Sequence, residues 1–495
     1  MRLARNLAAG IAHTLITTIV ALAVVPLYIR FLGSEAYGLI GFNATLQAVL
    51  QILELGLAPA ISREVARGLA SDDMPRTRNV LRSAAWIYWL VAALIALTFL
   101  LAAPTIAREW ISAEHLSSET VAQAVLLMGV MIACRWPSGL YTGALIGAHR
   151  LTVSSALAVI YIVIANIGAV LVIAFWSRTI EAFFIWQAGC ALVYTLATQE
   201  AAWRIVGGRA QAAFDPRALR SIWRFSVGMT GIALTGIIVS QLDKVILSAL
   251  LPLADFGHYM LATAVAMALY GVISALFKVV FPHFSARIAS GDEEGLRFEY
   301  RAISNLLAIV WFPGTMALIL CAEPLLLLWT GSPEIAADTT PVLALLTAGT
   351  ALHGMMYLPY SLQLAYGMTR LPLTINLMLM AVQVPLIIFL ALRFGAIGGA
   401  AAWLALHVLY FNLGTWMTHR RVLKGIGGKW MLRDAGVPLA ISIASGLAGA
   451  ALIARAGAGL PVHLLIGCGA GLLAFLAAAA LCPYKPAQIH AILAG

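Results

Sequence analysis

Charged side chains are scarce in this chain: they make up 11% of its 495 residues, whereas soluble globular domains carry roughly 25%. Hydrophobic residues reach 62%, and the mean hydropathy is +0.93. This composition excludes a soluble globular protein. It predicts an integral membrane protein.

Sequence signals of catalysis are also missing. The five cysteines stand alone in apolar runs or at their ends, so there is no disulfide framework and no metal-ligand spacing. No Walker A sequence occurs, which argues against direct use of ATP. We therefore predict that the protein is not an enzyme, with no catalytic residue, no metal and no cofactor.

Apolar runs of membrane-spanning length are abundant. A helix rises about 1.5 Å per residue and needs about 20 residues to cross the roughly 30 Å hydrocarbon layer. We predict an all-α fold with about 14 transmembrane helices, at residues 10–31, 39–60, 84–106, 121–147, 154–175, 182–202, 222–249, 258–281, 302–322, 339–363, 372–393, 397–418, 435–454 and 462–481. The first run is too long for a signal-peptide core and is expected to be retained.

The distribution of Lys and Arg predicts the orientation. Connections after even-numbered segments carry clusters of cations, at residues 63–82, 204–224 and 420–433, whereas connections after odd-numbered segments carry few. Short loops rich in Lys and Arg stay in the cytoplasm, so both termini are predicted to be cytoplasmic. The net charge of +10 then reflects topology. Because the cations are spread over separate loops, we expect no nucleic-acid partner.

One part of the sequence recurs about 220 residues later. LGSEAYG at 32–38 returns as LPLADFG at 251–257, and GAHRL at 147–151 returns as GMTRL at 367–371. Between these two matches, Pro59, Ser62, Ala66 and Gly68 return in the same order as Pro282, Ser285, Ala289 and Gly291. The offsets of the three matches, taken in chain order, are 219, 223 and 220 residues for the first, the four-residue and the last match, respectively. Duplicated helical bundles are typical of transporters.

The repeat and the orientation together predict the domains. Each half begins and ends inside, so the two bundles are related in parallel, about an axis along the membrane normal. We expect an N-terminal six-helix bundle at 1–202, a cytoplasmic linker at 203–221 and a C-terminal six-helix bundle at 222–418. Two additional transmembrane helices follow at 435–482. The glycines and Pro216 of the linker predict a hinge.

Ionisable residues inside the predicted spans are candidates for function, because burying a charge in lipid costs at least a few kcal/mol. Those that stand well within the spans are Glu54, Arg135, Asp243, Lys244 and Lys278. In the second segment Asn43, Gln47, Gln51 and Glu54 fall within a sector of about 80°, which makes one polar stripe on an apolar helix. In the fourth segment Pro137 predicts a kink beside Arg135. In the seventh segment Gln241 lies on one face with Lys244.

These polar stripes predict a shared hydrated cavity that binds an anionic cargo. The alternative is that such side chains only hydrogen-bond neighbouring helices, as many polar groups in membranes do. Three cations face two anions, however, and Asp243 is not expected to neutralise Lys244, since sequence neighbours on a helix point about 100° apart. We therefore predict that Arg135, Lys244, Lys278, Asn43, Gln47, Gln51 and Gln241 bind substrate, with Glu54 and Asp243 as candidates for H⁺ or Na⁺ coupling.

Three stretches resemble a known family: PLYIRFLGSEAYGLIGF at 26–42, LGLAPAISREVARG at 55–68 and SQLDKVILSALLPLADFGHY at 240–259. They are similar to the polysaccharide transporter family, the Wzx-type O-antigen and exopolysaccharide flippases of the multidrug/oligosaccharidyl-lipid/polysaccharide exporter superfamily. The resemblance covers essentially the whole chain. It implies a flippase that moves an undecaprenyl-pyrophosphate-linked oligosaccharide across the bacterial inner membrane by alternating access through a cationic cavity.

The resemblance also implies partners and roles. Arg135, Lys244 and Lys278 match the cationic lumen of the family, and Asp243 matches the acidic position typical of its seventh segment. Membrane lipids and the polysaccharide polymerase machinery are the implied partners, and the protein is expected to act as a monomer.

Three rival functions stay open. A lipid II flippase shares the architecture and differs in cargo. A multidrug or cation antiporter shares the fold but favours buried carboxylates. A polytopic polysaccharide polymerase or ligase would need a sizeable extracytoplasmic loop with catalytic groups, whereas the longest predicted outside connections, 108–120 and 323–338, are short.

Overall fold

The computed structural model describes residues 2–54, 56–71, 73–209, 212–457 and 459–484, apart from the side chains of 2–15, 217–233 and 275. These residues form helices, and the only pairing of extended backbone described is an isolated bridge between Ser112 and Pro252. The all-α prediction is confirmed. Packing divides the chain into two compact units, Met1–Gly257 and His258–Gly495.

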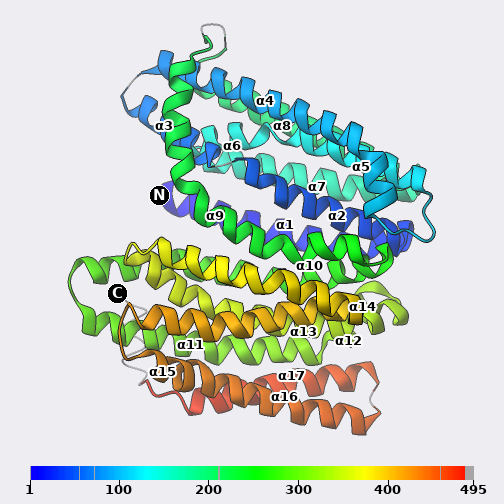
Figure 1. Cartoon of the computed structure of the whole chain (residues 1–495), viewed down its shortest axis with the longest axis vertical. Helices are drawn as coiled ribbons and strands as arrows, with labels where there is room; N and C mark the ends of the chain where they lie inside the picture. Colours follow the sequence, from blue (N-terminus) through cyan, green and yellow to red (C-terminus); the bar gives the residue numbers. More distant parts are fainter. Residues whose placement is uncertain (1, 55, 72, 210–211, 458, 485–495) are drawn as a thin grey trace. The chain divides into compact units, whose positions relative to one another are not determined.

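The first unit contains the helices α1 to α9 and the start of α10 (Figure 1). The bounds are α1 Arg2–Leu32, α2 Ser34–Leu50, η1 Gln51–Glu54, α3 Leu57–Ala70, α4 Met74–Thr105, η2 Ile106–Trp110, α5 Ser118–Arg135, α6 Ser138–Gly147, α7 Leu151–Phe175, α8 Ile180–Ile205 and α9 Pro216–Leu250.

The second unit contains the remainder of α10 and the helices that follow it. The bounds are α10 Leu253–Ala289, α11 Glu293–Leu320, α12 Ala322–Thr330, α13 Pro333–Ala365, α14 Arg370–His419, α15 Gly427–Lys429, η3 Trp430–Ala435, α16 Gly436–Ala456 and α17 Leu460–Ala480.

Eleven helices of the described chain are long and apolar enough to cross a membrane, and Ile16–Leu32 is a shorter apolar helix. They expose large apolar side chains that a soluble protein would bury, such as Leu101 at 71% and Leu465 at 72% exposure. The multi-pass membrane class predicted from the sequence is therefore confirmed. Within α14, Gly395 has a non-helical backbone (φ 57°, ψ −136°), so two helices meet there at a kink.

The recurring sequences occupy equivalent places in the helices. LGSEAYG leads into α2 and LPLADFG into α10, while GAHRL separates α6 from α7 and GMTRL separates α13 from α14. The N-caps of α4 and α11 are Asp73 and Asp292, and each side chain accepts a hydrogen bond from a backbone N–H of the first turn. The repeat is thus visible in where helices begin and end.

The connection between α8 and α9 is fastened to the start of α4. Arg78 Nε donates to the Val206 carbonyl at 2.8 Å, and the backbone N–H groups of Ala213 and Asp215 donate at 2.7 Å to Asn79 Oδ1 and Ser83 Oγ. Helix α9 packs against α2, α3 and α4. The described part of the predicted linker is therefore held by specific contacts of the first unit, and the compact units divide after Gly257.

Helices α3 and α6 approach each other through glycine. A Cβ atom at Gly143 would lie 2.7 Å from the Ala58 carbonyl oxygen, and one at Gly147 would collide with the backbone of Ser62. These two glycines and Gly139 are spaced four residues apart, so they form one face of α6. Small residues let membrane helices pack backbone to backbone.

We expect Gly143→Ala to destabilise the protein by about 1–3 kcal/mol, because the new methyl group must push α3 away. Alanine is otherwise the better helix former by roughly 0.5–1 kcal/mol. The control is Gly189→Ala on α8, where nothing lies within 4 Å of the added Cβ. Thermal unfolding in detergent should show a lower midpoint for the first variant only; equal midpoints would contradict the close approach.

Candidate functional site

The second predicted span is broken in the structure. Helix α2 ends at Leu50, Gln51–Glu54 form a 3₁₀ turn, and Gly56 adopts a left-handed backbone (φ 70°) before α3. The prediction of one continuous helix over 39–60 is wrong. In a 3₁₀ turn the side chains of residues i and i+3 eclipse, so Gln51 and Glu54 share one face of the turn.

The fourth predicted span is broken as well, and the predicted kink is confirmed. Helix α5 ends at Arg135, and α6 begins at Ser138 after Pro137. The two breaks lie together: Arg135 Nη1 donates to Gln47 Oε1 at 2.8 Å, and the Glu54 carboxylate lies where a Cβ of Gly139 would be. Interrupted helices of this kind mark substrate sites in many transporters.

Arg135 is an exposed cation held by neutral groups. Besides Gln47, its guanidinium lies over the ring of Tyr161, 5.4 Å from the centroid, and Tyr161 stacks on Tyr194 at 4.7 Å. Contacts with an amide and an aromatic face fix the guanidinium without cancelling its charge. This group can therefore meet an anion.

Glu54 is an acid at this site and lies within range of electrostatic attraction to Arg135. Its carboxylate lies beside the first turn of α6, where a negative charge is favoured by the helix dipole. Asn43 is buried at 6% exposure, and its Oδ1 has no hydrogen-bond partner among the described residues. A buried polar atom without a partner is uncommon and needs an explanation such as an ion or a water.

Lys244 does pair with Asp243, which corrects the expectation from the sequence. Its Nζ lies 3.0 and 3.1 Å from the two Asp243 carboxylate oxygens, and it also donates to the Ser240 carbonyl at 2.9 Å. Both side chains are buried, at 4% and 1% exposure. The helical angle between neighbouring residues applies at Cβ, whereas the flexible four-carbon stem of lysine lets the ammonium bend back to reach the carboxylate.

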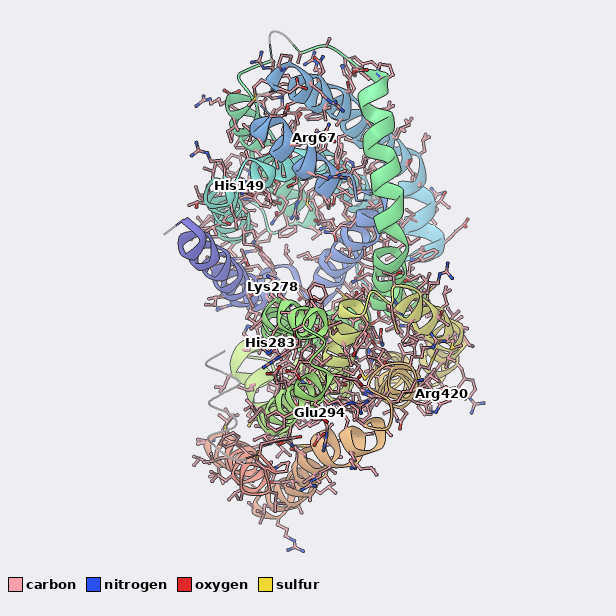
Figure 2. The ribbon with its side chains drawn as sticks, turned by 90° about the vertical axis from the view of Figure 1, so that its left-hand side faces the viewer. Arg67, His149, Lys278, His283, Glu294 and Arg420 are labelled. Atoms are coloured by element: carbon pink, nitrogen blue, oxygen red, sulfur yellow. The ribbon has the colours of Figure 1, made fainter. Side chains whose placement is uncertain are left out.

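The charge balance of the first unit therefore differs from the prediction. Of the five candidates that stand well within the predicted spans, this unit holds two cations, Arg135 and Lys244, and two anions, Glu54 and Asp243. Lys278 belongs to α10 in the second unit and is exposed; Figure 2 labels it. The predicted surplus of buried positive charge depended on a buried Lys278 and on an unneutralised Lys244. Lys278 is exposed and Lys244 is paired with Asp243, so this surplus is not found among these residues.

The remaining predicted residues lie on these same elements. Gln241 is half-buried on α9, and its Nε2 lies 3.5 Å from Ser240 Oγ. Gln51 is exposed in the 3₁₀ turn. Tyr161 and Tyr194 were missed by sequence reasoning, because aromatic residues in apolar helices are usually core or interfacial. Their tertiary contact with Arg135 leaves no local pattern.

The fold and this site define the class of protein: a multi-pass helical membrane protein with interrupted helices around a polar site. The sequence profile described as polysaccharide biosynthesis protein matches residues 3–287, more than half of the chain. The chain belongs to this family. The family resemblance found in the sequence is thereby confirmed.

Solved structures share the fold at low sequence identity. The lipid II flippase MurJ in an inward closed conformation has a TM-score of 0.70 and 14% identity, over 95% of this chain and 97% of that one. An inward-facing multidrug resistance MATE family transporter of the MOP superfamily gives 0.64 and 16%, over 82% and 95%. A MOP superfamily transporter from Pyrococcus furiosus gives 0.56 and 14%, over 84% and 95%. No curated protein matches the chain.

We expect Lys244→Met to lower the stability of the protein by about 3–5 kcal/mol, since it leaves the buried Asp243 carboxylate without the ammonium. The double variant Asp243→Asn, Lys244→Met removes both charges and should recover most of the loss. Thermal unfolding of the purified protein measures both effects. A double variant as unstable as the single one would show that the ion pair is not the cause.

Proposed function

We propose that this protein is a flippase that moves an undecaprenyl-pyrophosphate-linked oligosaccharide, the repeat unit of a polysaccharide, across the bacterial inner membrane. The observation that carries the proposal is membership of the polysaccharide biosynthesis protein family over residues 3–287. The MOP transporter fold supports it, because this architecture encloses a path between two sides of a membrane.

The proposed topology has fourteen spans and two parallel-related six-helix bundles, with both termini in the cytoplasm. Dividing α14 at its Gly395 kink adds one span to the eleven identified by length and composition. Helix α1 and the 35-residue α9 supply the other two. In the first unit, Arg67 lies near the end of α3 and His149 just after α6, at the end that the cation distribution assigns to the cytoplasm (Figure 2).

In this mechanism Arg135 receives the pyrophosphate, because its guanidinium is exposed and its hydrogen-bond and ring partners among the described residues, Gln47 and Tyr161, are neutral. Arginine binds phosphate oxygens through charge-assisted hydrogen bonds. Asn43, Gln47, Gln51 and Gln241 hydrogen-bond the glycan. Tyr161 and Tyr194 also line an apolar groove of about 420 Å³ between α7 and α8, which offers the polyprenyl chain a surface beside the guanidinium.

Lys244 and Lys278 take different parts. Lys278 is an exposed cation on α10, and its role as a ligand of the phosphate stays a prediction from the sequence. The Lys244 ammonium is occupied by Asp243, so it reaches a phosphate only when Asp243 is protonated or exchanges its partner. Asp243 and Glu54 are therefore the groups through which a H⁺ or Na⁺ gradient would couple to transport.

Export of cationic drugs is the second candidate function. The equal number of acids and bases among the candidate residues of the first unit favours it, because buried carboxylates attract cations. Lipid II remains an alternative cargo for a flippase.

Reconstitution into liposomes tests the proposal. Purified protein should move a fluorescent polyprenyl-pyrophosphate-linked oligosaccharide to the opposite leaflet faster than empty liposomes do, and faster than it moves labelled lipid II. Preference for lipid II would assign the protein to that cargo. Accumulation of a cationic dye without lipid movement would replace the flippase with an antiporter.

We expect Arg135→Gln to slow oligosaccharide flipping by about 10- to 100-fold, since a hydrogen bond to a charged group contributes roughly 1.5–3 kcal/mol. Arg135→Lys should retain part of the rate, because the charge remains. The matched control is Arg393→Gln in α14, another exposed arginine stacked on an aromatic ring. Equal rates for Arg135→Gln and the wild type would remove Arg135 from the site.

A gradient experiment separates the two acids. If Glu54 binds the coupling proton, an imposed proton gradient should accelerate wild-type transport and leave Glu54→Gln at its rate without a gradient. Asp243→Asn should show the same loss if Asp243 is the coupling group. Unchanged acceleration in both variants would exclude these carboxylates from proton coupling.

A further inference from the structure

A second polar cavity lies in the first unit, away from the broken helices. It has a volume of about 260 Å³ and opens between α4, α6, α8 and the residues that follow α8. Its lining residues are Arg82, Ala85, Trp86, Trp89, Tyr141, Gln199, Trp203 and Arg209. Two arginines, three tryptophans and a tyrosine thus converge on one small space.

The cavity carries positive charge without a compensating acid in its lining. In the amide orientation that satisfies both neighbours, the Gln199 oxygen accepts from Arg209 Nη1 at 3.0 Å and its nitrogen donates to the Tyr141 hydroxyl at 3.2 Å. The Arg209 guanidinium also lies over the Trp203 ring, 5.7 Å from the centroid. These partners are neutral, and no carboxylate is among the lining residues described for the cavity.

The position of Arg209 is fixed by the contacts that fasten the connection after α8. Arg78 holds the carbonyl of Val206, three residues before Arg209, and Asn79 holds the N–H of Ala213, four residues after it. Tyr141 is almost fully buried at 1% exposure and contacts the indoles of Trp89 and Trp203. When the side chains of a site are already ordered before a ligand binds, less of the binding free energy is lost to ordering them.

The chemistry selects a phosphate. Guanidinium groups bind phosphate oxygens bidentately, and two of them from different elements can hold one phosphate or diphosphate. The volume is below the roughly 300–1,000 Å³ of pockets for drug-sized ligands, so it suits a headgroup better than an oligosaccharide. Trp86 is 59% exposed at the rim. Tryptophan in such a position is typical of the membrane interface, which places the opening at the bilayer surface.

We propose that this cavity binds a phosphate group carried by a membrane lipid, with Arg82 and Arg209 as its ligands. The site is separate from Arg135 and does not require the proposed flippase activity. The end of the unit where it lies is the one that the cation distribution assigns to the cytoplasm.

Binding of radiolabelled geranylgeranyl diphosphate to the full chain in phosphatidylcholine nanodiscs tests the proposal, with every variant and its reference carrying Arg135→Gln so that the proposed pyrophosphate site does not contribute. We expect Arg82→Gln and Arg209→Gln each to raise the Kd by at least about tenfold, because each removes a charged hydrogen-bond donor. The matched control is Arg204→Gln: Arg204 lies on the same helix as Gln199 and pairs with Glu200 at 2.8 Å. Its Kd should stay at the reference value.

An isosteric variant distinguishes binding from a purely structural role. Gln199→Glu places a carboxylate beside Arg209, so it should weaken the diphosphate by about tenfold while keeping or raising the unfolding temperature. Competition identifies the source: unlabelled geranylgeranyl diphosphate or phosphatidylglycerol should displace the probe at concentrations at least about tenfold lower than inorganic diphosphate does.

Two results would overturn the proposal. An unchanged Kd in the Arg82 and Arg209 variants, or in Gln199→Glu, would show that the cavity does not bind the phosphate. Inorganic diphosphate competing as well as the lipids would assign the site to a free phosphate instead. Because this assay measures binding alone, its failure leaves the liposome transport assay of the flippase unaffected.

Discussion

The bilayer interior offers no hydrogen-bonding partner to a polypeptide backbone, and this constraint governs the structure. It requires continuous helices wherever the chain faces lipid, and it allows breaks only where protein or water supplies partners. The breaks at Gln51–Glu54 and after Arg135 meet this requirement by lying against each other. The glycine face of α6 is what permits that arrangement, since it brings the α3 backbone within reach.

Charged groups inside the chain are accommodated in different ways. Lys244 is neutralised by its own neighbour in sequence, whereas Arg135 makes no ion pair among the described residues and has the Glu54 carboxylate within range of electrostatic attraction. In the second unit, Arg301 binds Asp434 at 2.6 Å, and Arg287 binds Glu299, which His283 also contacts at 2.8 Å. These second-unit pairs tie helix ends together. Arg135 differs from these arginines because its hydrogen-bond partner is a neutral amide instead of a carboxylate.

Hydropathy predicted the class and most of the spans, because the length of a transmembrane helix is set by the thickness of the bilayer. The proline at position 137 predicted the break beside Arg135, since proline removes a helical hydrogen bond. The sequence analysis missed the break at Gly56, although a glycine between polar and apolar runs is a recognisable signal. The pairing of Lys244 with Asp243 and the stacking on Tyr161 depend on side-chain rotamers and tertiary contacts, which helical periodicity does not encode.

The hydrogen bonds that attach residues 206–209 and 212–215 to α4 have a mechanical consequence. A connection without such contacts would let α9 tilt independently of α4. Here three hydrogen bonds join the connection just before α9 to the N-terminal part of α4. Arg209 lies within this connection, and Asp243 and Lys244 lie further along α9. Restricting the connection before α9 therefore also restricts the movement of α9, the helix that carries the buried ion pair.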